Sequence, residues 1–153
     1  MTNIIELLNR DLEHLVEGVW RSLVQVRNGM GAGAGTIWHP DGLIVTNAHV
    51  LGRHGLSVVL MDGRTLPARV LAADTTHDVA ALAVEASGLD TIAPGDSRAL
   101  QPGQWVVAIG HPWGVTGAAT AGIVTASGLA LPEMPGEDHE WIATDLHLRP
   151  GHS

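Results

Sequence analysis

The first twenty residues carry apolar side chains at the spacing of an α-helix. Positions three or four apart lie on one face of a helix, and five such positions are apolar: Ile4, Leu8, Leu12, Leu15 and Val19. Asn3 with Glu6 three residues later fits a capping box at the helix start, and Gly18 fits a C-terminal stop. The pattern predicts one helix over residues 1–18, with its apolar stripe packed on the body of its own domain.

Beyond this helix the pattern changes to short runs of Val, Ile, Leu and Thr, separated by Gly, Pro and Asp. Such runs are typical of many short strands joined by tight connections. The predicted strands are residues 19–27, 35–39, 43–47, 57–61, 66–72, 79–84, 105–109, 116–126 and 141–144. They indicate an all-β domain, either closed into a barrel or packed as a sandwich.

Turn-forming residues mark the connections between these strands. Pro and Asp-Gly in residues 39–42, and Asp-Gly in residues 61–64, predict hairpins. The Gly-rich run before residue 35 lacks the Lys and the following helix of a phosphate loop, and predicts a flexible lead into a strand. Residues 85–104 hold few strand formers, which favours a connector. We therefore expect a first β unit over residues 19–88 and a connector with a second β unit over residues 89–153.

Composition narrows the classes of function. The net charge is −8 with eight Lys and Arg residues and no cluster of them, so nucleic acid is not an expected partner. The absence of Cys removes disulfides, thiolate zinc sites and Cys nucleophiles. With no Phe or Tyr, we expect a core of small aliphatic side chains, filled out by four Trp residues: Trp38, Trp105, Trp113 and Trp141.

The N-terminal residues carry acidic side chains among the apolar ones, with no unbroken apolar stretch followed by a cleavage site. As written, they are not a signal peptide. No later segment reaches the length of a membrane span. These patterns alone predict a cytoplasmic chain without a membrane span, and no motif predicts a cofactor.

Three residues together suggest nucleophilic catalysis. His49 directly follows a predicted strand, whose rigid end would hold the ring. Asp78 stands between a polar segment and the apolar run Val79–Val84, where a carboxylate can orient a histidine base. Ser153 ends the run RPGHS, residues 149–153, whose Pro and Gly favour a tight turn able to present a hydroxyl and backbone N–H groups.

Four segments resemble the HtrA/Deg family of trypsin-like serine proteases. Residues 41–51, DGLIVTNAHVL, resemble the segment around that family's catalytic histidine, and residues 74–84, DTTHDVAALAV, the segment around its aspartate. Residues 95–126 are similar to the stretch that opens the family's second barrel. Residues 144–153, TDLHLRPGHS, are similar to the run leading into the serine. The segments follow the family's order, and the resemblance spans roughly residues 19–153.

The resemblance implies a chymotrypsin-like double β-barrel, with the first barrel complete, the second partial and a short helix in front. It implies a serine endopeptidase, with His49 as general base, Asp78 as its orienting residue and Ser153 as nucleophile. The backbone N–H groups of Gly151 and Ser153 would form the oxyanion hole. Expected partners are polypeptide substrates, unfolded proteins among them. The family also suggests a homo-oligomer, commonly a trimer, in the periplasm.

The sequence departs from the family pattern at its end. The family usually has Asn where this chain has His152, and it continues past the serine with residues that complete the second barrel and the specificity pocket. We therefore expect little activity from the 153-residue polypeptide alone. In that polypeptide the terminal carboxylate of Ser153 would lie close to where negative charge must develop.

Two other functions stay open on the sequence. One is a trypsin-like module that binds peptides or assembles with partners without cleaving them. The other is metal binding by a late group of histidines and carboxylates: Glu137, Asp138, His139, His147 and His152. No pair in that group has the short, regular spacing of common metal motifs, so no metal site is predicted. His77 and His111 flank matched segments but belong to no predicted triad.

Overall fold

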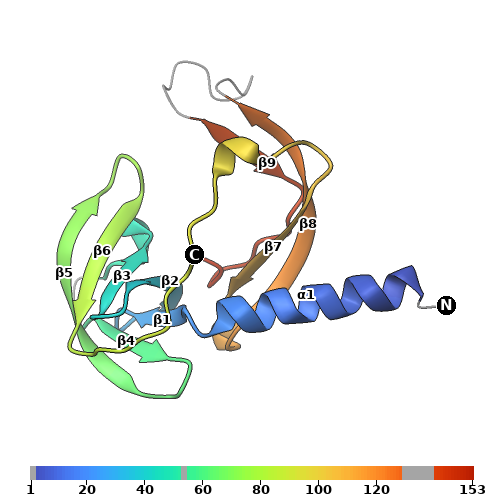
Figure 1. The fold of residues 1–153 in the computed structure, drawn as a ribbon. Coiled ribbons are helices and arrows are strands. Elements are labelled where there is room, and N and C mark those ends of the chain that lie inside the picture. Colours follow the sequence, from blue (N-terminus) through green and yellow to red (C-terminus); the bar gives the residue numbers. More distant parts are fainter. Residues whose placement is uncertain (1–2, 53–54, 129–139) are drawn as a thin grey trace. The chain divides into compact units, whose positions relative to one another are not determined.

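The fold comprises a helix, a closed barrel and a three-stranded sheet (Figure 1). It was obtained as a computed structural model, which describes residues 3–52, 55–128 and 140–153. The chain forms two compact units. The first comprises Met1–Ile92, Ile109–Ala118 and Arg149–Ser153, and the second Ala93–Ala108 and Ala119–Leu148.

Helix α1 spans Ile4–Trp20 and begins as the sequence predicts. The side chain of Asn3 accepts a hydrogen bond from the Ile5 N–H at 3.1 Å. The predicted stop at Gly18 is wrong, because Gly18 keeps helical backbone geometry and the helix continues to Trp20. No side chain of α1 is buried in the described part of the chain, so the predicted packing of its apolar stripe is not observed. Trp20 anchors the helix end by donating its indole N–H to the Gly117 carbonyl at 2.8 Å.

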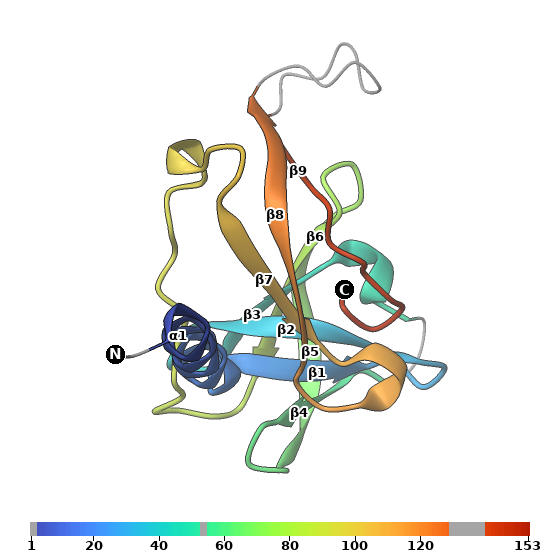
Figure 2. The same ribbon diagram turned by 90° about the vertical axis from the view of Figure 1, so that its right-hand side faces the viewer.

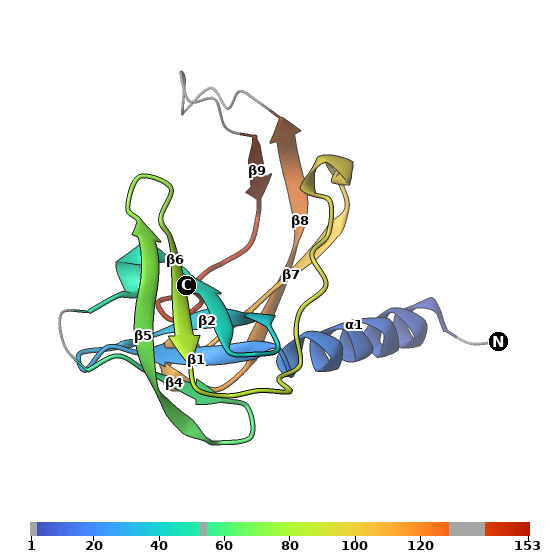
Figure 3. The ribbon, with the colours of Figure 1, turned by 60° about the vertical axis from the view of Figure 1, so that its left-hand side comes forward.

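Six strands of the first unit close into an antiparallel barrel in the order β1-β2-β3-β6-β5-β4 (Figure 3). Closure comes from β1, which pairs with both β2 and β4. The strands are β1 Leu23–Arg27, β2 Ala32–His39, β3 Leu43–Thr46, β4 Ser57–Leu60, β5 Thr65–Asp74 and β6 Val79–Val84. The all-β prediction is therefore confirmed, as a barrel.

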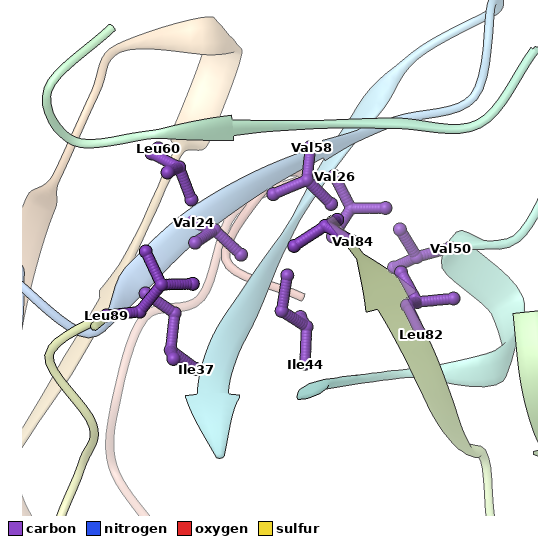
Figure 4. Packing of buried hydrophobic residues seen from close by; sticks show 10 residues of the cluster. All are labelled: Val24, Val26, Ile37, Ile44, Val50, Val58, Leu60, Leu82, Val84 and Leu89. Atoms are coloured by element: carbon purple, nitrogen blue, oxygen red, sulfur yellow. The ribbon is translucent and has the colours of Figure 1, made fainter. Parts of the chain in front are cut away.

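The interior of this barrel is aliphatic. Inward positions alternate along the strands, and the side chains that meet inside are Val24, Val26, Ile37, Ile44, Val50, Val58, Leu60, Leu82, Val84 and Leu89 (Figure 4). The predicted Val, Leu and Ile core is confirmed. The prediction that Trp side chains fill out the core is wrong for three residues, since Trp38, Trp105 and Trp113 are 49%, 60% and 75% exposed.

Glycines let the strands of the barrel approach closely. The Gly-rich run predicted as a flexible lead belongs to β2 itself. A Cβ at Gly35 would lie 3.0–3.1 Å from methyl groups of Val24, Val26 and Ile44. A Cβ at Gly33 would lie 2.7 Å from the methyl groups of Val50. The glycines therefore make room for core side chains, which a flexibility argument from composition does not reveal.

The later part of the chain forms a sheet of three strands in the order β7-β8-β9 (Figure 2). The connector before it contains a short 3-10 turn, η2, at Ser97–Ala99. The strands are β7 Trp105–Gly110, β8 Ala118–Gly128 and β9 Trp141–Thr144, with the one-turn helix η3, Pro112–Gly114, between the first two. Together with the barrel, this sheet confirms a complete first barrel and a partial second one. Among the described residues, no helix is long and apolar enough to cross a membrane.

Candidate active site

His49 lies on the one-turn helix η1, Ala48–Val50, directly after β3. Its neighbours Ala48 and Val50 are buried, whereas the His49 side chain is 56% exposed. The Asn28 side chain donates to the Val50 carbonyl at 2.9 Å and holds this turn. Burial on both sides therefore fixes the backbone at His49 and leaves the ring accessible.

Asp78 lies just before β6 and meets His49, which is 29 residues away in sequence. Its Oδ2 lies 2.6 Å from His49 Nδ1, and its Oδ1 accepts the His49 backbone N–H at 2.9 Å. Asn47 Nδ2 donates to both the Asp78 carbonyl and Oδ2, at 3.1 Å each. Asp78 has a positive φ of 52°, a conformation that Asp tolerates better than most side chains. Three donors thus hold the carboxylate in one orientation.

These contacts favour the ionised carboxylate. The pKa of Asp78 lies below its ordinary value. The largest cause is the hydrogen bond from the His49 backbone N–H, followed by the hydrogen bond from the His49 ring. An ionised Asp78 can only accept, so His49 carries its proton on Nδ1 when neutral. The second ring nitrogen, Nε2, is then the basic atom available to another group.

The segment of residues 149–153 holds the predicted nucleophile Ser153 and is here called the nucleophile turn; it is also in the first unit. The His152 N–H donates to the Arg149 carbonyl at 3.0 Å, and His152 Nδ1 lies 3.0 Å from both the Arg149 nitrogen and its carbonyl oxygen. Gly151 has a φ of 99°, which favours glycine. The Ser153 carbonyl accepts from the Ala34 N–H of β2 at 2.7 Å. The nucleophile turn is therefore fastened to the first barrel.

Asp78 and His152 line one cleft of about 270 Å³, together with Leu23, Ala34, Gly35, Thr36, Val45, Thr46, Asn47, Val79 and Ile109. Within the described ranges, no hydrogen bond joins the Ser153 hydroxyl to His49. The backbone N–H groups of Gly151 and Ser153 likewise have no acceptor among the described residues. The structure thus brings His49 and Asp78 into contact and places the nucleophile turn in the same unit, with two N–H groups that have no acceptor in the described part of the chain.

One contributor was missed by the sequence prediction. The predicted strand over residues 43–47 ends at Asn47, yet the Asn47 amide supports Asp78. Its place two residues before His49 was the available signal, because a side chain there can reach the partner of the histidine. Among the described residues, no group of three His, Asp or Glu side chains could hold a metal ion; Glu137, Asp138 and His139 lie outside those residues.

Comparison with known families agrees with this geometry. The model of the trypsin-like peptidase domain matches residues 33–153, so the chain belongs to the trypsin-like peptidase family. Its relatives are serine proteases of the HtrA/DegP kind. The resemblance seen in the sequence is therefore confirmed.

Three relatives illustrate the similarity. The chain is 41% identical over 126 residues to the putative serine protease HhoB of Synechocystis, covering 80% of this chain and 30% of that protein. It is 45% identical over 125 residues to a probable periplasmic serine endoprotease, DegP-like, of Halomonas elongata, covering 79% and 25%. A protein of the same name from Hahella chejuensis is 42% identical over 129 residues, covering 83% and 27%. The chain thus spans less than a third of the length of these relatives.

Proposed function

We propose that the protein is a serine endopeptidase that hydrolyses polypeptides through an acyl-enzyme. The observation that carries the proposal is the 2.6 Å contact between His49 Nδ1 and Asp78 Oδ2, supported by membership of the trypsin-like peptidase family. A histidine held this way by a carboxylate is the general base that activates a serine hydroxyl.

In the proposed reaction, His49 Nε2 removes the proton of the Ser153 hydroxyl while the oxygen attacks the scissile carbonyl carbon. The tetrahedral intermediate carries negative charge on the former carbonyl oxygen. His49 then gives the proton to the leaving amine, the C–N bond breaks, and an ester to Ser153 remains. Water, deprotonated by His49, then attacks the ester carbonyl carbon, the ester C–O bond breaks, and His49 returns the proton to the Ser153 oxygen.

The oxyanion would be stabilised by the backbone N–H groups of Gly151 and Ser153. Both lack an acceptor in the described part of the chain, so they are available to a developing negative charge. Such donors are preorganised because the turn that carries them is already bonded to β2. Asp78 keeps the Nδ1 proton in place and stabilises the imidazolium formed during attack.

The proposal extends to substrate, assembly and compartment through the relatives. Two of the relatives described above are named periplasmic serine endoproteases. We propose polypeptide substrates, unfolded proteins among them, an extracytoplasmic site of action and a homo-oligomer, with a trimer as the assembly to test. No charge cluster in the sequence favours a nucleic acid partner.

The test is reaction with a fluorophosphonate probe, which labels only an activated serine. The protein is produced from its complete gene, treated with the probe and digested, and the labelled residue is identified by mass spectrometry. We expect the label on Ser153, with none on Ser153→Ala and almost none on His49→Ala.

Two outcomes contradict the proposal. Peptide cleavage that persists in Ser153→Ala would place the nucleophile elsewhere. Peptide binding by a folded protein that neither labels nor cleaves would favour the non-catalytic trypsin-like module. Isothermal titration with a peptide library measures that binding independently of chemistry.

A further inference from the structure

The nucleophile turn rests on a second turn, residues 111–114, here called the supporting turn. The His111 N–H donates to the Gly151 carbonyl at 2.6 Å, and the Trp113 N–H donates to the Pro150 carbonyl at 3.3 Å. Figure 2 shows the two turns side by side, the nucleophile turn in red near the C-terminus and the supporting turn in orange. The backbone that would carry the oxyanion donors is therefore held by the backbone of the supporting turn.

Close approach between these turns leaves no room for side chains. A Cβ on Gly151 would collide with the His111 carbonyl, and a Cβ on Gly110 would lie 2.6 Å from the Cα of His152. Because the contact is between backbones, a shift of the supporting turn cannot be absorbed by side-chain rotation. Any movement at His111 is transmitted directly to Gly151.

His111 fixes the supporting turn through its side chain. It is 1% exposed, and its Nδ1 faces the Gly117 N–H at 3.4 Å, which requires Nδ1 to act as an acceptor. The Gly117 carbonyl in turn accepts the indole N–H of Trp20 at 2.8 Å. His111 Nε2 is buried and makes no hydrogen bond with the described residues. The proposed triad does not use this ring.

This environment suits only the neutral imidazole. Protonation would place a second donor opposite the Gly117 N–H and a charge where water does not reach. Burial lowers the pKa of His111; a polar contact with the Val24 backbone opposes this effect, and the positive charge of Arg27 adds to it. The nucleophile turn, whose Gly151 carbonyl accepts the His111 N–H, also carries the titratable or charged side chains of Arg149 and His152.

We propose that His111 is a positioning residue of the nucleophile turn that functions only as neutral imidazole, so that its protonation on acidification displaces Gly151 and switches off acylation of Ser153. This inference rests on the proposed peptidase function. Activity would then be lost by protonation of His111, which is remote from the reacting atoms, as well as by protonation of His49. Two histidines must then be neutral for activity, and the switch is steeper than one base can give.

The first measurement is the rate of fluorophosphonate labelling of Ser153 between about pH 5 and 8, the range over which histidines change charge. When two neutral groups are needed, the rate falls about 100-fold for each unit once the pH is below the pKa values of both groups, and about tenfold for each unit when one is needed. We expect the steep fall in the unmodified protein and the shallow fall in His111→Asn. Asparagine keeps an acceptor at the position of Nδ1 but does not titrate.

Two control variants separate the causes. His152→Asn removes the other nearby imidazole and is expected to keep the steep fall. His111→Leu removes both acceptor and charge, and is expected to label slowly at every pH, with the shallow fall. Thermal unfolding of each variant checks that it is folded.

Amide hydrogen exchange at the His111 and Trp113 N–H groups, which donate to carbonyls of the nucleophile turn, gives a readout in the unmodified protein that needs no activity. The protection factor of these N–H groups is expected to fall as the pH falls and His111 becomes protonated. It is expected to stay constant in His111→Asn. The inference is overturned if the unmodified protein and His111→Asn share one acid slope, or if the protection factors of these N–H groups, corrected for the intrinsic exchange rate, are independent of pH. Absence of labelling at every pH, with pH-dependent exchange still present, would instead contradict the peptidase proposal and leave the switch intact.

Discussion

The first unit contains two His–Asp pairs that look alike by distance. His49 Nδ1 lies 2.6 Å from Asp78 Oδ2, and His77 Nδ1 lies 2.5 Å from Asp74 Oδ2. All four side chains are about half exposed, and each carboxylate also accepts backbone N–H bonds. Geometry between the two partners alone therefore does not distinguish a base from a structural pair.

The surroundings of the two pairs differ. Asp74 and His77 are three residues apart, and Asp74 caps the turn between β5 and β6 by accepting the N–H groups of Thr76 and His77. Asp78 instead reaches across 29 residues to His49 and lines the cleft that His152 also lines. The long-range pair holds two separate elements of the barrel at a cleft, whereas the local pair closes its own turn.

Removal of each histidine is expected to give the largest difference between the two pairs. His49→Ala is expected to lower kcat/KM for peptide hydrolysis on the order of 10⁶-fold, because the serine loses its base. His77→Ala is expected to leave it within about threefold, as surface changes away from a site usually do. Steady-state hydrolysis of an unstructured peptide measures both. Equal losses in the two variants would show that distance to the cleft does not separate the pairs.

The two aspartates provide the next test. Asp78→Asn is expected to lower kcat about 10⁴-fold, since the amide can no longer hold the Nδ1 proton and favours the wrong tautomer. Asn tolerates the positive φ at this position, so the fold should persist. Asp74→Asn is the matched control, with kcat close to that of the unmodified protein. A small loss in Asp78→Asn would remove Asp78 from the proposed triad.

Much of this comparison was visible in the sequence. The alternation of apolar residues predicted the strands of the barrel, and the segment around residues 41–51 marked His49. The sequence could not show that Trp38, Trp105 and Trp113 are exposed, because a bulky apolar residue on a strand can face either side of the sheet. Composition also suggests a flexible Gly-rich run, whereas glycine is favoured at position 35 because Val24 and Ile44 pack against it.

Contacts between distant segments were hardest to predict. Asn47 and His111 lie in segments that the sequence analysis had singled out, but their partners Asp78 and Gly151 are far away along the chain. Only the folded backbone reveals that the carbonyl of Gly151 meets the N–H of His111. Residue type, spacing and the family resemblance predicted the candidate reactive groups, whereas the candidate positioning residues needed the three-dimensional contacts.

Asn47 provides a third difference between the two pairs, because its amide donates to Asp78. Asn47→Ala is expected to lower kcat about tenfold, as expected for loss of hydrogen bonds to a charged group that has other donors. A double-mutant cycle checks the route of this effect. If Asn47 acts through Asp78, then Asn47→Ala should add little to the loss already present in Asp78→Asn. Fully additive losses would show that Asn47 acts independently of Asp78.

The smallest effect expected is a difference in how each carboxylate responds to loss of its histidine. The pKa of each aspartate lies below its ordinary value, but the largest cause differs: the His77 side chain for Asp74, and the His49 backbone N–H for Asp78. Replacement by alanine removes a side chain and keeps the N–H. His77→Ala should therefore raise the pKa of Asp74 more than His49→Ala raises that of Asp78.

Carbon-detected NMR titration of the two carboxyl groups measures these changes. A lowered pKa means that each ionised carboxylate stabilises the folded protein above the ordinary value of 3.8, and that this contribution is lost as the pH falls below it. His77→Ala should shrink the acid-sensitive part of the unfolding free energy more than His49→Ala does. The reverse order would mean that the His49 ring, rather than its backbone, is the main support of Asp78, and that the long-range pair is held chiefly by its side chains.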